Sequence, residues 1–129
     1  MGPLHAVRVL VVDDDPDMRQ ILRAWIEQTG ATVLSAADGA HALEVARENK
    51  PDLVFCDLRM PRFDGYAFMD GFARDQQLCH VPVLVLSGEM DPAEIRRTWE
   101  AGFSGHLVKP VTKDAVLAQI QRVLPAESR

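Results

Sequence analysis

Apolar residues along this chain follow two alternating patterns: short continuous runs, and longer stretches in which they recur every three or four positions. The short runs are rich in Val, Leu and Ile, which is typical of strands that are buried on both faces. The longer stretches are typical of helices that bury one face. The short runs predict five strands, at Val7–Val12, Ala31–Ala37, Leu53–Cys56, Val81–Leu86 and His106–Val108.

A helix is predicted after each of these strands. The first helix begins at Pro16, because proline suits a first helical position, and Gly30 ends it. The second helix follows the capping residue Asp38 and ends before Pro51. The other three helices are predicted at about Tyr66–Arg74, Pro92–Ala101 and Lys113–Leu124.

The strict alternation of strands and helices predicts an α/β fold, with a doubly wound five-stranded parallel sheet that helices cover on both faces. The chain has 129 residues, 47% of them apolar, which is the size of a single domain with its core over about residues 7–124. No output domain is expected, because the sequence stops soon after the fifth helix. In sheets of this kind, ligands bind beyond the carboxyl ends of the strands.

The charge, the lengths of the apolar runs and the cysteines exclude several classes of partner and site. The net charge is −5 without a basic cluster, so we expect no direct binding to DNA or RNA. No apolar run approaches the roughly 20 residues that span a bilayer, and no signal peptide is evident, so we expect a cytoplasmic protein without a membrane partner. Cys56 and Cys79 form no CxxC or zinc-ligand pattern and are predicted to be reduced, mostly buried thiols.

Polar residues follow four of the predicted strands: Asp13 and Asp14, then Asp57, Ser87 and Lys109. Three carboxylates at one edge of a sheet would repel one another unless a cation joined them, and oxygen ligands of this kind suit Mg²⁺. A lysine can neutralise one charge, and a serine hydroxyl can hydrogen-bond an oxyanion. Each residue alone has an ordinary explanation, such as a helix cap or a turn, but their coincidence at one edge favours a site. Asp15 or Asp17 is expected to cap the first helix instead.

The motifs around these residues resemble the receiver domain of the bacterial response-regulator family, the CheY-like family. The matching motifs are LVVDDDPDMR with Asp13 and Asp14, CDLRMPRFDG with Asp57, LSG with Ser87, and GHLVKP with Lys109. The resemblance extends over residues 7–124. It implies a flavodoxin-like sheet with the strand order 2-1-3-4-5, and a cis peptide bond before Pro110.

The resemblance implies that the chain is the phosphoacceptor of a two-component phosphorelay. Asp57 would receive a phosphoryl group from a histidine kinase or a histidine phosphotransfer protein, with help from Ser87 and Lys109. The expected Mg²⁺ ligands are Asp57, Asp14, Asp13 (directly or through a water) and the backbone carbonyl of Arg59. Such a protein is a signalling domain that assists only its own phosphorylation and dephosphorylation, and not an enzyme in the usual sense.

The resemblance also implies an output surface on the fourth helix, the fifth strand and the fifth helix, where a downstream protein would bind. On this surface Trp99 is either a packing residue or an anchor for the partner. His106 stands where the family usually has an aromatic switch residue. Histidine is smaller and can gain a charge near neutral pH, so a pH-sensitive output and a strand histidine without a switching role both stay open. We expect a monomer or a weak homodimer.

Three other functions are compatible with an α/β fold of this size. A degenerate receiver that acts only as an interaction scaffold is disfavoured, because all five site residues are present. An aspartyl phosphatase of the haloacid-dehalogenase kind requires a D-x-D motif, but the second residue after Asp57 is Arg59. A flavodoxin-like cofactor binder needs a phosphate-binding loop after the first strand, where DDDPD would repel a phosphate.

Overall fold

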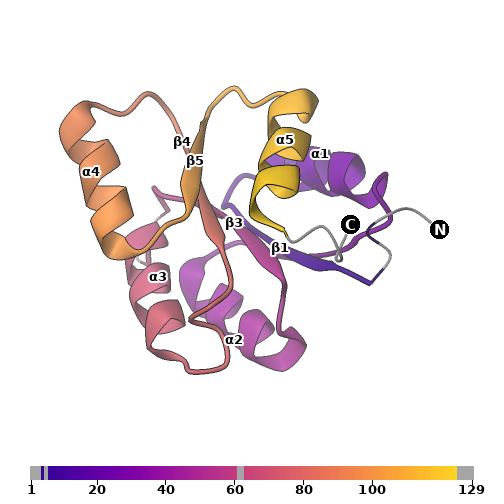
Figure 1. Cartoon of the computed structure of the whole chain (residues 1–129), viewed down its shortest axis with the longest axis horizontal. Helices are drawn as coiled ribbons and strands as arrows, with labels where there is room; N and C mark the ends of the chain where they lie inside the picture. The colour runs from indigo at the N-terminus through magenta and orange to yellow at the C-terminus, as the bar shows by residue number, and fades with distance from the viewer. Residues whose placement is uncertain (1–3, 5, 61–62, 125–129) are drawn as a thin grey trace.

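The computed structural model describes residues 4, 6–60 and 63–124, and it has the predicted α/β architecture (Figure 1). One parallel sheet has the strand order β2-β1-β3-β4-β5, which is the order that the family resemblance implied. Its strands are β1 (Arg8–Val12), β2 (Thr32–Ala36), β3 (Leu53–Asp57), β4 (Val83–Ser87) and β5 (Gly105–Val108). The helices are α1 (Pro16–Glu27), α2 (Gly39–Asn49), α3 (Gly65–Arg74), α4 (Pro92–Ala101) and α5 (Lys113–Val123).

The strands differ from their predicted bounds by one or two residues, and the differences that matter for the site are at β3 and β4. Asp57 and Ser87 are the last residues of β3 and β4, whereas the sequence pattern placed both just beyond the strands. Strand β4 begins at Val83 and not at Val81, because the Val81 N–H donates to the Leu78 carbonyl at 2.9 Å in a turn. Both site residues are therefore held by the sheet itself, which restricts their movement.

Acidic side chains cap four of the five helices, and a threonine caps the fifth. Each cap side chain accepts a hydrogen bond from a backbone N–H of the first helical turn, which satisfies a donor that the helix leaves free. The cap residues are Asp15, Asp38, Asp64, Asp91 and Thr112. The expectation that residue 15 or 17 caps the first helix is confirmed, since Asp15 accepts from the Asp17 N–H.

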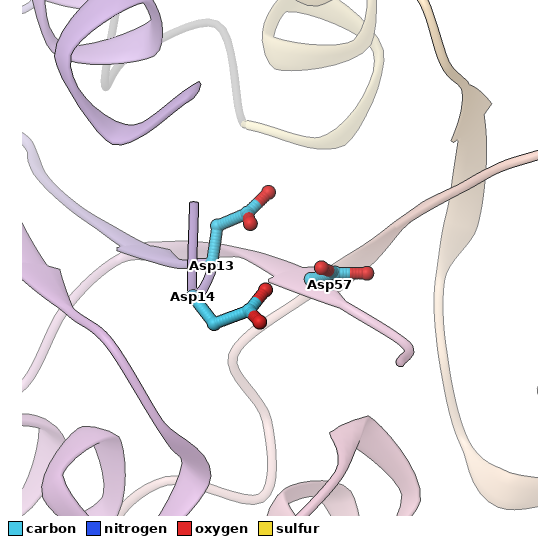
Figure 2. A group of neighbouring side chains, drawn as sticks. All are labelled: Asp13, Asp14 and Asp57. Atoms are coloured by element: carbon cyan, nitrogen blue, oxygen red, sulfur yellow. The ribbon is translucent and has the colours of Figure 1, made fainter. Parts of the chain in front are cut away.

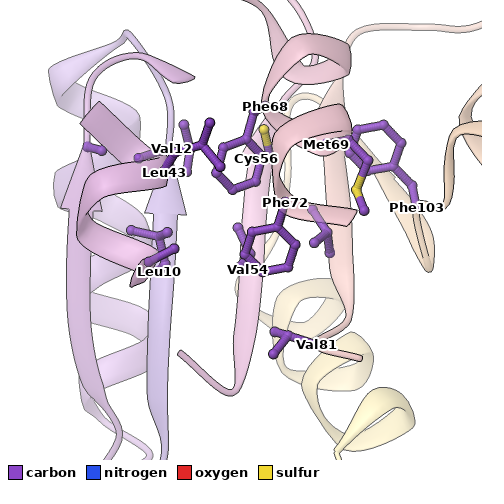
Figure 3. Packing of buried hydrophobic residues seen from close by; sticks show 14 of the residues in the cluster. Leu10, Val12, Leu43, Val54, Cys56, Phe68, Met69, Phe72, Val81 and Phe103 are labelled. Carbon is purple, nitrogen blue, oxygen red and sulfur yellow. The ribbon is translucent and has the colours of Figure 1, made fainter. Parts of the chain in front are cut away.

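The hydrophobic core forms two layers, one on each face of the sheet. Alternate residues of a strand point to opposite faces, so Val54 and Cys56 of β3 pack towards α2 and α3, while Phe55 packs towards α1 and α5. Figure 3 shows part of the first layer, in which Phe68 and Phe72 of α3 cover these strands. All residues of β3 and β4 are buried, so the sheet forms a rigid base for the side chains at its carboxyl edge.

Helix α4 is attached to this core by fewer buried side chains than the other helices. Thr98 is its one buried residue, and Trp99 has 52% of its surface exposed. Trp99 is therefore half-exposed and not part of the buried core, and its role as a packing residue or as an anchor for a partner stays a prediction. A helix with few buried apolar contacts is held more loosely than its neighbours.

The two cysteines differ in their exposure. Cys56 is buried in β3, as predicted, whereas Cys79 is exposed and the prediction for it is wrong, because it lies in the turn that connects α3 to β4. Both thiols are free. None of the helices in the described ranges has the length and the apolar character that crossing a membrane requires.

Candidate functional site

Three aspartates meet at the carboxyl edge of the sheet (Figure 2). Asp13 follows β1, Asp14 comes next in the chain, and Asp57 ends the neighbouring strand β3. One carboxylate oxygen of each lies within 4.8 Å of the other two. Asp13 is fully buried, Asp57 is 6% exposed and Asp14 is exposed to solvent. The cluster is therefore anchored in the protein on one side and open to solvent on the other.

Lys109, which directly follows β5, joins the cluster. Its Nζ donates to Asp13 Oδ2 at 3.1 Å and to Asp57 Oδ2 at 3.3 Å. Its backbone N–H donates to the Ser87 carbonyl, which ties the loop after β5 to the end of β4. The Lys109–Pro110 peptide bond is cis, in agreement with the family resemblance. One ammonium group thus faces three carboxylates, and negative charge remains in excess.

The environment of Asp57 makes its ionised form costly. Burial is the main cause, and the charge of Asp13 adds to it, so the pKa of Asp57 rises to about 6. The Arg59 N–H, which donates to Asp57 Oδ1 at 3.1 Å, and the Lys109 ammonium act in the opposite direction. Burial lowers the pKa of Lys109, but its hydrogen bonds and ion pairs with Asp13 and Asp57 outweigh burial, and the pKa of Lys109 is raised.

Ser87 lies at the end of β4, the strand next to Asp57, and is only 3% exposed. Its hydroxyl is buried and has no hydrogen-bond partner among the described residues. A buried polar group without a partner costs about 1–3 kcal/mol, and a ligand or a reacting group that binds it would remove this cost. The hydroxyl is therefore available to a group that enters the site beside Asp57.

The three aspartates, Ser87 and Lys109 are brought to one edge of the sheet, whereas the two predicted output residues lie elsewhere. His106 is half-buried in β5, where it pairs with Val85, and Trp99 projects from α4. Val108 of β5 is also exposed. Pro61 of the predicted phosphoacceptor loop motif lies outside the described residues.

Two contacts beside the site could not be predicted from the sequence. The Arg59 guanidinium forms an ion pair with Glu94, in the first turn of α4. The Arg97 guanidinium carbon lies 4.0 Å above the centroid of the Tyr66 ring, in the geometry of a cation–π contact. All four side chains line one hollow of about 420 Å³ between α4 and the loop after β3.

The donors of the aspartate cluster are suited to a small divalent cation. All three are carboxylates, and hard oxygen donors with excess negative charge are what Mg²⁺ prefers. Described residues outside the cluster contribute a single nearby ammonium group, that of Lys109, which does not neutralise three acids. The residues present therefore fit a magnesium site.

Residues 9–121 match the family model described as "Response regulator receiver domain". The chain is 37% identical over 110 residues to Regulator of RpoS from Escherichia coli K12, an alignment that covers 84% of this chain and 32% of the relative. It is 38% identical over 118 residues to the transcriptional regulatory protein PrrA of Mycobacterium tuberculosis, covering 91% of this chain and 49% of the relative. The chain thus spans about a third of the length of the first of these curated relatives and about half of the length of the second.

Solved structures with the same fold include the chemotaxis protein CheY4 of Vibrio cholerae. It superposes with a TM-score of 0.88 at 33% identity, covering 92% of this chain and 98% of CheY4. The signal receiver domain of a signal transduction histidine kinase from Syntrophus aciditrophicus superposes with a TM-score of 0.82 at 27% identity, covering 95% of this chain and 90% of that domain. The fold is therefore shared over almost the whole described chain.

Proposed function

The chain belongs to the response regulator receiver family, signalling domains that interact with histidine kinases and downstream effectors, and on this premise we propose that it accepts a phosphoryl group on Asp57. The observation that carries the proposal is the position of Asp57. Its carboxylate is held at the end of a buried strand, 3.3 Å from the Lys109 ammonium and beside the acidic pair. A nucleophile fixed in this way is oriented before the donor arrives.

In the proposed reaction, an Asp57 carboxylate oxygen attacks the phosphorus of a phosphohistidine. The new O–P bond forms as the P–N bond breaks, and the histidine nitrogen keeps the electron pair of that bond. Lys109 neutralises charge on the transferring group, and the unpaired Ser87 hydroxyl donates a hydrogen bond to one of its oxygens. The remaining requirement is positioning, since phosphoryl transfer needs little further covalent chemistry from the protein.

We place Mg²⁺ at the three aspartates, with the backbone carbonyl of Arg59 as a further ligand. Receiver domains generally bind this ion at an acidic pocket, and the aspartate cluster here offers the right donors. When bound, the ion supplies positive charge next to the carboxylates and the phosphoryl oxygens. Asp13, Asp14 and Asp57 would hold it, and the Lys109 ammonium, which pairs with Asp13 and Asp57, would share in neutralising the site.

The proposed donor is a histidine kinase or a histidine phosphotransfer protein. The proposed output surface consists of α4, β5 and α5, on which Trp99 and Val108 are exposed. Exposed apolar side chains of this size suit a protein partner. The two interpretations of His106, as a pH-sensitive switch or as a strand residue without that role, stay hypotheses. Equal partner affinity of wild type and His106→Phe between about pH 6 and 7.5 would reject the first.

The proposal is tested by incubating the protein with acetyl phosphate and Mg²⁺ and measuring the intact mass. We expect wild type to gain one phosphoryl group and Asp57→Asn to gain none. Asp70→Asn, an exposed acid on α3, is the matched control and should behave like wild type. A folded wild-type protein that gains no phosphoryl group would instead support the interaction scaffold, and gain by Asp57→Asn would place the acceptor elsewhere.

A further inference from the structure

Arg59 connects the predicted phosphoacceptor to α4. Its backbone N–H donates to Asp57 Oδ1 at 3.1 Å, while its guanidinium pairs with Glu94. The Arg59 side chain is 72% exposed and that of Glu94 is 17% exposed, so the ion pair lies at the edge of the hollow beside the site. The same residue therefore touches the reacting carboxylate with its main chain and the first turn of a helix with its side chain.

The pair matters because α4 has so few other attachments. Among the residues of α4, Thr98 alone is buried, although Ala101 at the end of the helix is partly buried against the core. The Arg97 guanidinium also contacts the Tyr66 ring of α3. Arg97 lies one turn after Glu94, so the two contacts hold successive turns of the helix. Loss of the Glu94 contact would leave the first turn of α4 with little to hold it.

We propose that Glu94 is a positioning residue that competes with the phosphoryl group for Arg59. This inference rests on the proposed phosphorylation of Asp57. Before phosphorylation, Glu94 keeps the guanidinium turned towards α4. A phosphoryl group on Asp57 adds a charge of about −2 and three acceptor oxygens, and a guanidinium can bind two of them at once.

The exchange is favourable because the two partners of Arg59 differ in charge. A partly exposed ion pair contributes at most about 1 kcal/mol, whereas a phosphoryl group offers Arg59 a doubly charged partner with three acceptor oxygens. The Arg59 main chain already contacts the Asp57 carboxylate, so its flexible side chain can turn from one partner to the other without moving the loop. Glu94 then loses its partner, and the first turn of α4 is released while Arg97 still holds the second.

The test measures the affinity of the intact protein for beryllium trifluoride, a phosphoryl mimic, in the presence of Mg²⁺. The four proteins are wild type, Glu94→Gln, Arg59→Gln and the double variant, and Glu27→Gln is the control. Glu27 also forms an exposed ion pair, with Arg23, but at the last residue of α1. Glutamine keeps the size of glutamate and removes the charge that competes for Arg59.

We expect Glu94→Gln to bind the mimic about two- to fivefold more tightly than wild type. Arg59→Gln should bind it more weakly, and adding Glu94→Gln to that variant should change nothing, because Glu94 acts through Arg59. Glu27→Gln should match wild type. Hydrogen exchange of the first turn of α4 should accelerate when wild type binds the mimic, and should already be fast in free Glu94→Gln.

Equal tightening by Glu94→Gln with and without Arg59 would overturn the proposal, because it would indicate a general charge effect. No tightening in the presence of Arg59 would overturn it as well. Both outcomes would leave the proposed phosphorylation intact. If wild type neither bound the mimic nor gained a phosphoryl group from acetyl phosphate, the proposed function itself would fail, and the role of Glu94 with it.

Discussion

The ammonium group of Lys109 lies 3.3 Å from the Asp57 carboxylate, across 52 positions of the sequence. This single cation does not offset the burial of Asp57 and the charge of Asp13, because the pKa of Asp57 is still raised to about 6. The fold therefore destabilises the ionised form of Asp57. The positive charge of a bound cation would stabilise the ionised carboxylate.

The raised pKa of Asp57 predicts how stability depends on pH in a chelating, metal-free buffer. The folded protein holds the Asp57 proton up to about pH 6, whereas the unfolded chain loses it near the ordinary value of 3.8. Between these values the folded state binds more protons, so this contribution to the free energy of unfolding decreases as pH rises and is lost above about pH 6. Asp57→Asn should therefore be more stable than wild type at pH 7.5, by about 1–2 kcal/mol, and the difference should shrink towards pH 4.

Urea unfolding of both proteins across this pH range measures the difference. Asp70→Asn on α3 is the control, because its side chain is well exposed, and its difference from wild type should stay small at every pH. A gap between wild type and Asp57→Asn that stays constant from pH 4.5 to 7.5 would mean that Asp57 ionises normally in the folded protein.

Ser87→Ala is expected to slow phosphorylation without destabilising the folded protein. The Ser87 hydroxyl has no partner among the described residues, so its removal loses no hydrogen bond there and relieves the cost of an unpaired buried group. The free energy of unfolding should therefore stay unchanged or rise, by at most about 3 kcal/mol. Phosphorylation by acetyl phosphate should slow by about tenfold or more, because a donor to the transferring group is lost. Thermal unfolding and the rate of phosphoryl gain are the two measurements. Severe destabilisation with normal phosphorylation would contradict both expectations.

The parts of the site that lie at strand ends could be predicted from the sequence, because a strand end can be recognised locally. Asp13, Asp57 and Ser87 follow or end buried apolar runs, and parallel strands bring such ends to one edge. The pairing of Arg59 with Glu94 depends instead on how α4 packs against a loop 35 positions earlier, which no local pattern encodes. The exposure of Cys79 could not be predicted for a related reason. The residues around it in the sequence do not indicate whether it lies in a surface turn or in the core.

Gly65 is expected to be required for the geometry of the site. A Cβ at this position would lie 2.7 Å from the Asp57 carbonyl oxygen and 2.9 Å from the Leu58 Cα, both backbone atoms that cannot move aside cheaply. Gly65→Ala should therefore destabilise the protein by about 1–3 kcal/mol and displace Asp57. Gly88→Ala is the matched control, since a Cβ there meets no described atom within 4 Å. Thermal unfolding of the two variants should differ clearly, and similar midpoints would exclude the close approach at Gly65.

Mg²⁺ is expected to stabilise the folded protein, because it binds three carboxylates that are close together only in the fold. At a concentration ten times its dissociation constant, a ligand of the folded state adds about 1.4 kcal/mol to the free energy of unfolding. Bound cation would also lower the pKa of Asp57, so affinity should increase as pH rises through about 6. Asp14→Asn should remove most of the stabilisation, whereas Asp17→Asn, which changes an exposed acid in the first turn of α1, should retain it. Thermal unfolding with added Mg²⁺ or with chelator measures the effect, and equal stabilisation of the two variants would show that the ion binds outside the aspartate cluster.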